Sequence, residues 1–268
     1  MSAPTVATPS FAATVGAVAR GTRPLLFKAR GWVLGALVLG PVLGALLVMG
    51  LIALKTEGPN PFGVRIGLTV YHSVLVSFMV PIMALVAAGA GIREDLEQRT
   101  LPLMLVRPAV IPALPFGKGL PWFLWGALWL TLGALLLQGT GGGWESLPGR
   151  ITALVALWWA ELAFVTALSL VFKRGLLWSA LWFFVWERFL TLFPPTLQRL
   201  TFTHHAQSLA GSRFNESKAS DFLAQVQVDT PFLLALLALA AAGAACWAWA
   251  GWKLHRTPTG LAGAETEG

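Results

Sequence analysis

Residues 92–118, IREDLEQRTLPLMLVRPAVIPALPFGK, place a dense group of charges between two long apolar runs. Residues 92–99 have helical character, because polar side chains cover most faces and Ile92 lies one turn from Leu96. Such a segment cannot lie in hydrocarbon, where each unpaired polar group costs several kcal/mol. We therefore expect it on one face of a membrane, between two spans, where a soluble partner can dock.

The second half of this segment predicts another short helix. Thr100 suits the N-cap position, and Pro102 then falls in the first turn, where its missing N–H costs little. The helix should end by Arg107, because Pro108 disfavours the α conformation in the residue before it. The pattern predicts a two-part helical element near the membrane face.

Composition indicates an integral membrane protein. Hydrophobic residues make up 56% of the 268 residues and charged residues only 12%, whereas ordinary soluble domains carry about 25% charged residues. The mean hydropathy is +0.70. A single cysteine, Cys246, excludes an internal disulfide. The net charge of +7 does not indicate nucleic-acid binding, because no wide soluble domain exists to present a basic patch.

The apolar runs predict an all-α fold with six transmembrane helices. The expected spans lie at about residues 31–54, 66–91, 120–138, 151–172, 175–193 and 231–252. They form a transmembrane domain over residues 31–256. Residues 1–30 are expected to be a cytoplasmic tail or interfacial segment, in which Gly21 and Pro24 interrupt a weak amphipathic pattern. Residues 257–268 form a short cytoplasmic tail.

Basic residues predict the orientation of these spans. Most of the 19 Lys and Arg fall in the N-terminal tail, residues 92–118, the Lys173-Arg174 turn and the C-terminal end. Lys and Arg are enriched in cytoplasmic loops. Both termini and the 92–118 segment are therefore expected in the cytoplasm, with the chain in the plasma (inner) membrane.

Three charged residues lie within expected spans: Glu161 in the fourth, and Glu187 with Arg188 in the fifth. Charges at membrane depth cost at least about 2.5 kcal/mol and usually face protein or water. Glu187 and Arg188 are adjacent on a helix and cannot both face one partner. A Glu161–Arg188 contact that fixes packing is one interpretation, and a substrate or proton role is the other.

Small and aromatic residues predict how the spans pack. Gly31 with Gly35, and Gly40 with Gly44, have the spacing that lets helices approach closely. The thirteen tryptophans either line a path for an amphipathic cargo or face lipid and the interface. We favour the second interpretation.

No enzyme or metal site is predicted. Lys118 lies between Gly117 and Gly119, but no glycine-rich phosphate-binding loop precedes it, so the chain is not itself an ATPase. His204-His205 lacks the further ligands at the spacing that a metal site needs. No cofactor is therefore expected on this chain.

The 92–118 segment resembles the loop after the second span of type-2 ABC exporter permeases. The matching positions are Asp95 and Glu97, Thr100-Leu101, Leu103 to Leu105, Arg107-Pro108 and Gly117-Lys118. The spacings from Thr100 to Pro108 and from Pro108 to Lys118 also agree. The chain departs from the family at Arg99, where glycine is usual, and at Pro102, Pro112 and Pro115.

This resemblance implies a cytoplasmic coupling helix that sits in a groove of an ATP-binding subunit. The coupling residues would be Asp95, Glu97, Thr100, Leu101, Leu105, Arg107, Pro108 and Lys118. It also implies two copies of the ATP-binding subunit, which hold ATP and Mg, and a second permease chain that is expected to be identical. The first and fifth spans would meet across the dimer, and short external helices would lie between spans five and six.

A different class of function also fits the sequence. The chain could be an ATPase-independent carrier or channel that uses Glu161, or a cofactor-binding membrane anchor that uses His72 or His205. The fixed spacing in residues 92–118 favours the transport subunit of an ATP-driven exporter.

Overall fold

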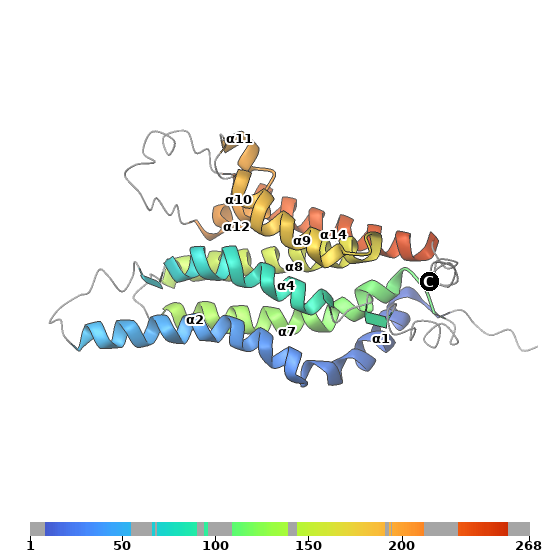
Figure 1. Cartoon of the computed structure of the whole chain (residues 1–268), viewed down its shortest axis with the longest axis horizontal. Coiled ribbons are helices and arrows are strands. Elements are labelled where there is room, and N and C mark those ends of the chain that lie inside the picture. The colour runs from blue at the N-terminus through green and yellow to red at the C-terminus, as the bar shows by residue number, and fades with distance from the viewer. Residues whose placement is uncertain are drawn as a thin grey trace, which may run out of the picture.

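The computed structural model describes residues 9–54, 66–67, 69–89, 94–95, 109–138, 144–190, 193, 195–211 and 230–256. Every regular element among these residues is a helix, which confirms the predicted all-α class. Figure 1 shows the long helices running roughly parallel as a bundle, with shorter helices at its two ends.

In the described part of the chain, five helices are long and apolar enough to cross a membrane, which confirms a membrane-embedded protein. They are α2 (Ala29–Ala53), η1 with α4 (Val70–Met79 and Val80–Gly89), α7 (Ala113–Gln138), η2 with α8 (Trp144–Ser146 and Leu147–Val171), and α14 (Phe232–Arg256). Their positions agree with five of the six expected spans.

The fifth expected span, residues 175–193, is helical over residues 175–190 in the described part of the chain. It consists of α9 (Gly175–Leu181), the π-helical turn η3 (Trp182–Trp186) and α10 (Glu187–Leu190). A helix of this length rises about 24 Å, less than the roughly 30 Å of a hydrocarbon core. The predicted count of six membrane-crossing helices is therefore not confirmed.

The N-terminal segment differs from the expectation of an interrupted helix. α1 (Phe11–Leu26) is continuous and contains both Gly21 and Pro24. Ser10 caps it, accepting a hydrogen bond from the Ala13 N–H at 3.2 Å. Packing outweighs the weak sequence pattern, because α1 buries one face against α7.

The third span also begins earlier than expected, at Ala113 instead of residue 120. Pro115 falls in the first turn of α7, where a proline has no intrahelical N–H bond to lose. The approach to Lys118 is therefore helical despite Pro112 and Pro115.

The core of the bundle is built around α8, which packs against α14, α7, α12 and α4. Trp158 of α8 is fully buried and donates its indole N–H to the Phe123 carbonyl at 2.9 Å. A Cβ atom at Gly126 would lie 2.6 Å from the Trp158 ring. Lipid tails supply no hydrophobic drive for helix association, so such close contacts hold membrane helices together.

The predicted packing residues divide into two groups. Gly31 and Gly35 lie in close contacts, with a Cβ at Gly35 only 2.7 Å from the Trp129 ring, whereas Gly40 and Gly44 have nothing within 4 Å.

The prediction that tryptophans face lipid is wrong for Trp122 and Trp158, which are buried, but Trp32 is 54% exposed. Tryptophan rings thus serve both the core and the outer surface.

Among the described residues between α10 and α14 lie two short helices, α11 (Pro195–Gln198) and α12 (Phe202–Ala210). Thr201 caps α12, accepting from the His204 N–H at 3.2 Å, and Gly211 ends it with φ 64°. These helices lie where the resemblance implies short helices. A further short helix, which Ser220 before Asp221 and Phe222 predicts, lies outside the described residues.

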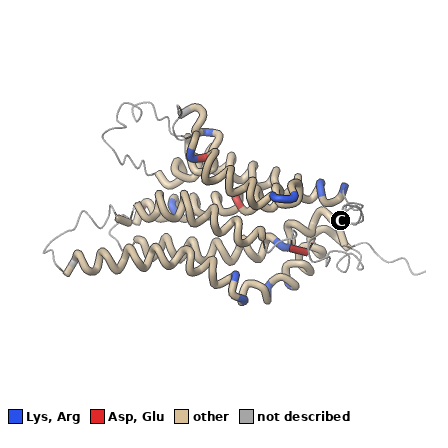
Figure 2. Tube along the Cα trace, viewed as in Figure 1, with Lys and Arg blue, Asp and Glu red and all other residues tan. Residues whose placement is uncertain are grey.

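Most of the described Lys and Arg residues lie at one end of the bundle (Figure 2). At the end where α7 begins and α14 ends lie Arg20, Arg23, Lys28, Arg30, Lys118, Lys173, Arg174, Lys253 and Arg256. Arg150, Arg188 and Arg199 lie toward the other end. We call the end where α7 begins and α14 ends the basic end.

The close contact between Gly126 and Trp158 predicts a steric effect. Gly126→Ala should destabilise the fold by about 1–3 kcal/mol, because the fully buried ring has no room to move. Gly44→Ala is the matched control, since nothing lies within 4 Å of it. Thermal unfolding in detergent compares the two, and equal midpoints would contradict this packing.

Candidate functional site

Lys118 lies in the second turn of α7 and is only 6% exposed. A buried ammonium group needs a partner of opposite charge. Asp95, which is 8% exposed, supplies it: its Oδ2 forms an ion pair with the Lys118 Nζ. Two residues at opposite ends of the 92–118 segment are thus joined at the basic end.

A second ion pair lies beside the first. The Arg30 Nη1 of α2 lies 2.5 Å from the Glu94 Oε2. The two side chains are 54% and 30% exposed, and exposed ion pairs contribute only about 0–1 kcal/mol. Its main consequence is positional. It holds Glu94 beside the start of α2, while the adjacent Asp95 contacts α7.

Gly117 gives α7 a third contact at this end. A Cβ atom there would lie 2.9 Å from the Val18 Cβ, so α1 packs directly on the α7 backbone. The Val110 N–H also donates to the Thr14 Oγ1 at 3.3 Å. The adjacent residues Gly117 and Lys118 therefore hold two different partners, α1 and Asp95, which gives the Gly-Lys step of the motif a physical role.

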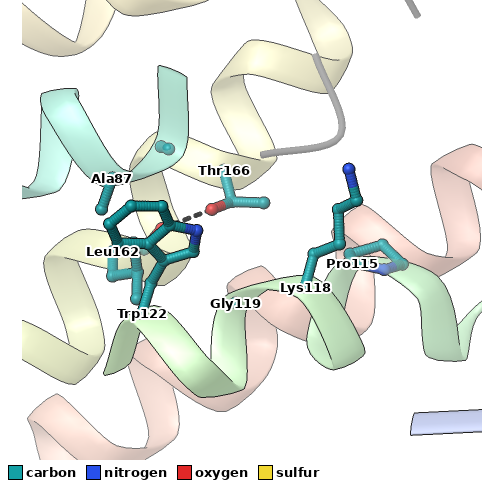
Figure 3. A pocket seen from close by; sticks show the side chains of 8 residues that line it. Ala87, Pro115, Lys118, Gly119, Trp122, Leu162 and Thr166 are labelled. Atoms are coloured by element: carbon teal, nitrogen blue, oxygen red, sulfur yellow. Dashed lines mark hydrogen bonds between the residues drawn. The ribbon is translucent and has the colours of Figure 1, made fainter. Parts of the chain in front are cut away.

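A small pocket lies next to Lys118, between α4, α7 and α8 (Figure 3). Its lining residues are Ala87, Ala88, Pro115, Lys118, Gly119, Trp122, Leu162 and Thr166. The Thr166 hydroxyl donates to the Leu162 carbonyl at 2.7 Å. The cavity volume is about 10 Å³, room for roughly one water molecule. The space beside the ion pair is therefore far too small for a cargo.

The remaining predicted coupling residues fall outside the described part of the chain. These are Glu97, Thr100, Leu101, Leu105, Arg107 and Pro108. Of the predicted coupling set, the structure therefore places Asp95 and Lys118, and it brings them into direct contact.

Glu161 is fully buried in α8. Neither carboxylate oxygen has a hydrogen-bond partner among the described residues. The predicted contact with Arg188 is not formed. Arg188 instead donates to the Ser77 carbonyl at 3.1 Å and lies 4.6 Å from the centroid of the Phe78 ring. The two helices present these side chains to different neighbours, which helical spacing alone does not reveal.

Glu187 has a structural role at the opposite end. Its Oε1 accepts from the Phe202 N–H at 3.1 Å, and its Oε2 accepts from the Thr203 hydroxyl at 2.5 Å. Both donors lie in the first turn of α12, whose N–H groups lack intrahelical partners. As expected for adjacent helical residues, Glu187 and Arg188 face different elements.

Sequence reasoning missed a buried polar cluster toward the end of the bundle that lies opposite the basic end. The hydroxyl of Tyr71, the only tyrosine, donates to the Arg150 carbonyl at 2.8 Å. The Arg150 Nη1 lies 3.4 Å from the Gln138 Oε1. The lone tyrosine beside His72 in an apolar run was the available signal, but nothing in the sequence pairs it with Arg150.

His72 and His205, the histidines of the alternative cofactor-anchor function, both contact other groups of the protein. His72 packs edge-on against Tyr71, with ring centroids 4.8 Å apart. The His205 Nε2 lies 2.9 Å from the Arg199 carbonyl, and burial lowers the pKa of His205. Among the described residues, no three His, Cys, Asp or Glu side chains are grouped as metal ligands.

The Asp95–Lys118 pair predicts a non-additive pattern of stabilities. Asp95→Leu or Lys118→Met alone should cost about 3–5 kcal/mol, because each leaves a buried charge unpaired. The double variant should recover most of that loss. Thermal unfolding of the four proteins measures the coupling, and additive losses would show that the two charges do not stabilise each other.

No family model matches the chain, and no curated protein matches it.

Proposed function

We propose that this chain is the membrane subunit of an ATP-driven exporter, similar to type-2 ABC permeases. The observation that carries the proposal is the spacing of the motif residues in 92–118 together with the direct contact of Asp95 with Lys118. The described residues on either side of 96–108 are both held at one end of the bundle, Asp95 by Lys118 and Val110 by Thr14. A soluble subunit that docks there acts directly on α7.

The distribution of charge supports the orientation of the chain in the membrane. Lys and Arg concentrate at the basic end, and such residues favour the cytoplasmic side. With that end in the cytoplasm, both termini and the 92–118 segment lie where ATP is available. The chain then belongs to the plasma (inner) membrane, and ATP with Mg binds to the partner subunit.

The proposed mechanism begins when two ATP-binding subunits close on each other. Closure presses on the element from Asp95 to Pro108, and the Asp95–Lys118 pair passes the displacement to α7. α7 packs on α1, α2 and α8, so the spans move with it. A second, identical permease chain completes the path, and this chain carries no catalytic residue of its own.

The proposal predicts which variant loses the ATP-binding partner. Glu97→Arg with Leu101→Asp should abolish co-purification, because a charge reversal and a buried polar group at a central contact weaken binding by roughly 30-fold or more. The gently purified chain is assayed for a bound protein with ATPase activity.

Arg199→Glu with Leu200→Asp is the matched control, since Arg199 and the 65% exposed Leu200 lie toward the opposite end. This control should keep the partner. The proposal fails if the wild-type chain binds no ATPase in mild detergent, or if the folded loop variant retains it.

One observation favours a second candidate, an ATPase-independent carrier: Glu161 is fully buried and has no hydrogen-bond partner among the described residues. Intramembrane acids often carry protons in transporters.

The two candidates predict opposite results in vesicles under an imposed membrane potential. For a carrier, Glu161→Gln stops proton movement, read with a pH-sensitive dye, while the Glu97→Arg/Leu101→Asp variant keeps it. For the exporter, the wild-type chain alone moves no protons. The exposed Glu145→Gln serves as the control for loss of a carboxylate.

A further inference from the structure

The turn between α1 and α2 presents a group of exposed basic side chains. Arg20 and Arg23 lie one turn apart on the outer face of α1, and Lys28 and Arg30 follow at the start of α2. Figure 2 shows the Lys and Arg positions along this turn. Arg30 pairs with Glu94, whereas the structure gives Arg20, Arg23 and Lys28 no ion pair with the described residues.

Exposed aromatic side chains lie directly beside these charges. Phe27 is 65% exposed and Trp32 is 54% exposed. Both pack edge-on against Trp125 of α7, with ring centroids 5.5 and 6.2 Å apart. The Trp125 indole N–H donates to the Gly31 carbonyl at 2.9 Å, which fixes the turn. The aromatic surface is therefore held against α7 and remains exposed.

The position of the turn determines what can occupy this surface. α2 is one of the five candidate spans, and Lys28 immediately precedes it. Tryptophan and phenylalanine beside basic residues at the start of a span are typical of the headgroup boundary of a bilayer. The positive charges then lie at the depth of lipid phosphates, and the rings lie at the depth of the upper acyl chains.

We propose that the α1–α2 turn is a binding site for an anionic phospholipid, with the headgroup phosphate held by Arg20, Arg23 and Lys28 and the acyl chain lying against Trp32. Positive charge complements the anionic headgroup, and the exposed aromatic rings fit the lipid chain. Each basic residue near such a surface contributes about fivefold in binding. The inference needs only the membrane embedding and not the proposed ATP-binding partner.

The full chain in detergent tests this site with added phosphatidylglycerol against added phosphatidylcholine. Retained lipid is counted by native mass spectrometry. Arg20→Gln with Arg23→Gln should weaken phosphatidylglycerol binding by about 25-fold, two fivefold factors, and leave phosphatidylcholine binding unchanged. Lys173→Gln with Arg174→Gln removes the same charge from another exposed position at the basic end and should bind phosphatidylglycerol as wild type does.

Two results would overturn the proposal: equal retention of both lipids by the wild-type chain, or equal loss in both double variants. A salt titration of the wild-type chain gives an independent reading if a variant fails to fold. Phosphatidylglycerol retention should fall as salt rises, because the attraction is between exposed charges, and salt-independent retention would also contradict it. Inorganic phosphate should not displace the lipid, since it makes no contact with the aromatic surface; displacement would show an anion site alone.

Discussion

Close packing of helices around α8 is the constraint on which the rest of the structure depends. Inside a bilayer, burial of apolar area gives no advantage to helix contact over lipid contact. Shape complementarity therefore decides which helices meet. Trp158 fills the space left by Gly126, and a Cβ at Gly243 would collide with the Trp159 ring. These contacts set α7 and α14 against α8, and the ends of the bundle follow from that arrangement.

The two ends of the bundle use polar groups in different ways. At the opposite end, Glu187 accepts hydrogen bonds from the first turn of α12 and so holds a short helix against the bundle. At the basic end, Lys118 and Asp95 join α7 to the chain that follows the second span. Glu187, Lys118 and Asp95 are all buried, where an unpaired charge is expensive. Polar contacts thus position the connecting segments, while apolar contacts hold the spans.

The sequence predicted the helical class and most span positions because long apolar runs have few alternatives in a membrane. Spans at residues 31–54 and 151–172 agree with α2 and α8 within a few residues. Local rules failed where packing decides. α1 is continuous through Pro24, and Arg188 reaches Ser77 instead of Glu161. The motif in residues 92–118 contains both Asp95 and Lys118, so the sequence singled out both partners of this ion pair. The Tyr71–Arg150 hydrogen bond depends on tertiary structure alone.

α7 connects the features that bear on function. Along its length, Gly117 contacts α1, Lys118 pairs with Asp95, Trp125 bonds the start of α2, and Gly126 receives Trp158. In the proposed coupling, a displacement at Asp95 would reach α1, α2 and α8 through these contacts of α7. The lipid surface at the α1–α2 turn is held by the same helix through Trp125. A lipid bound there would resist movement of α7, which makes the turn a point where the membrane can oppose or favour the proposed coupling.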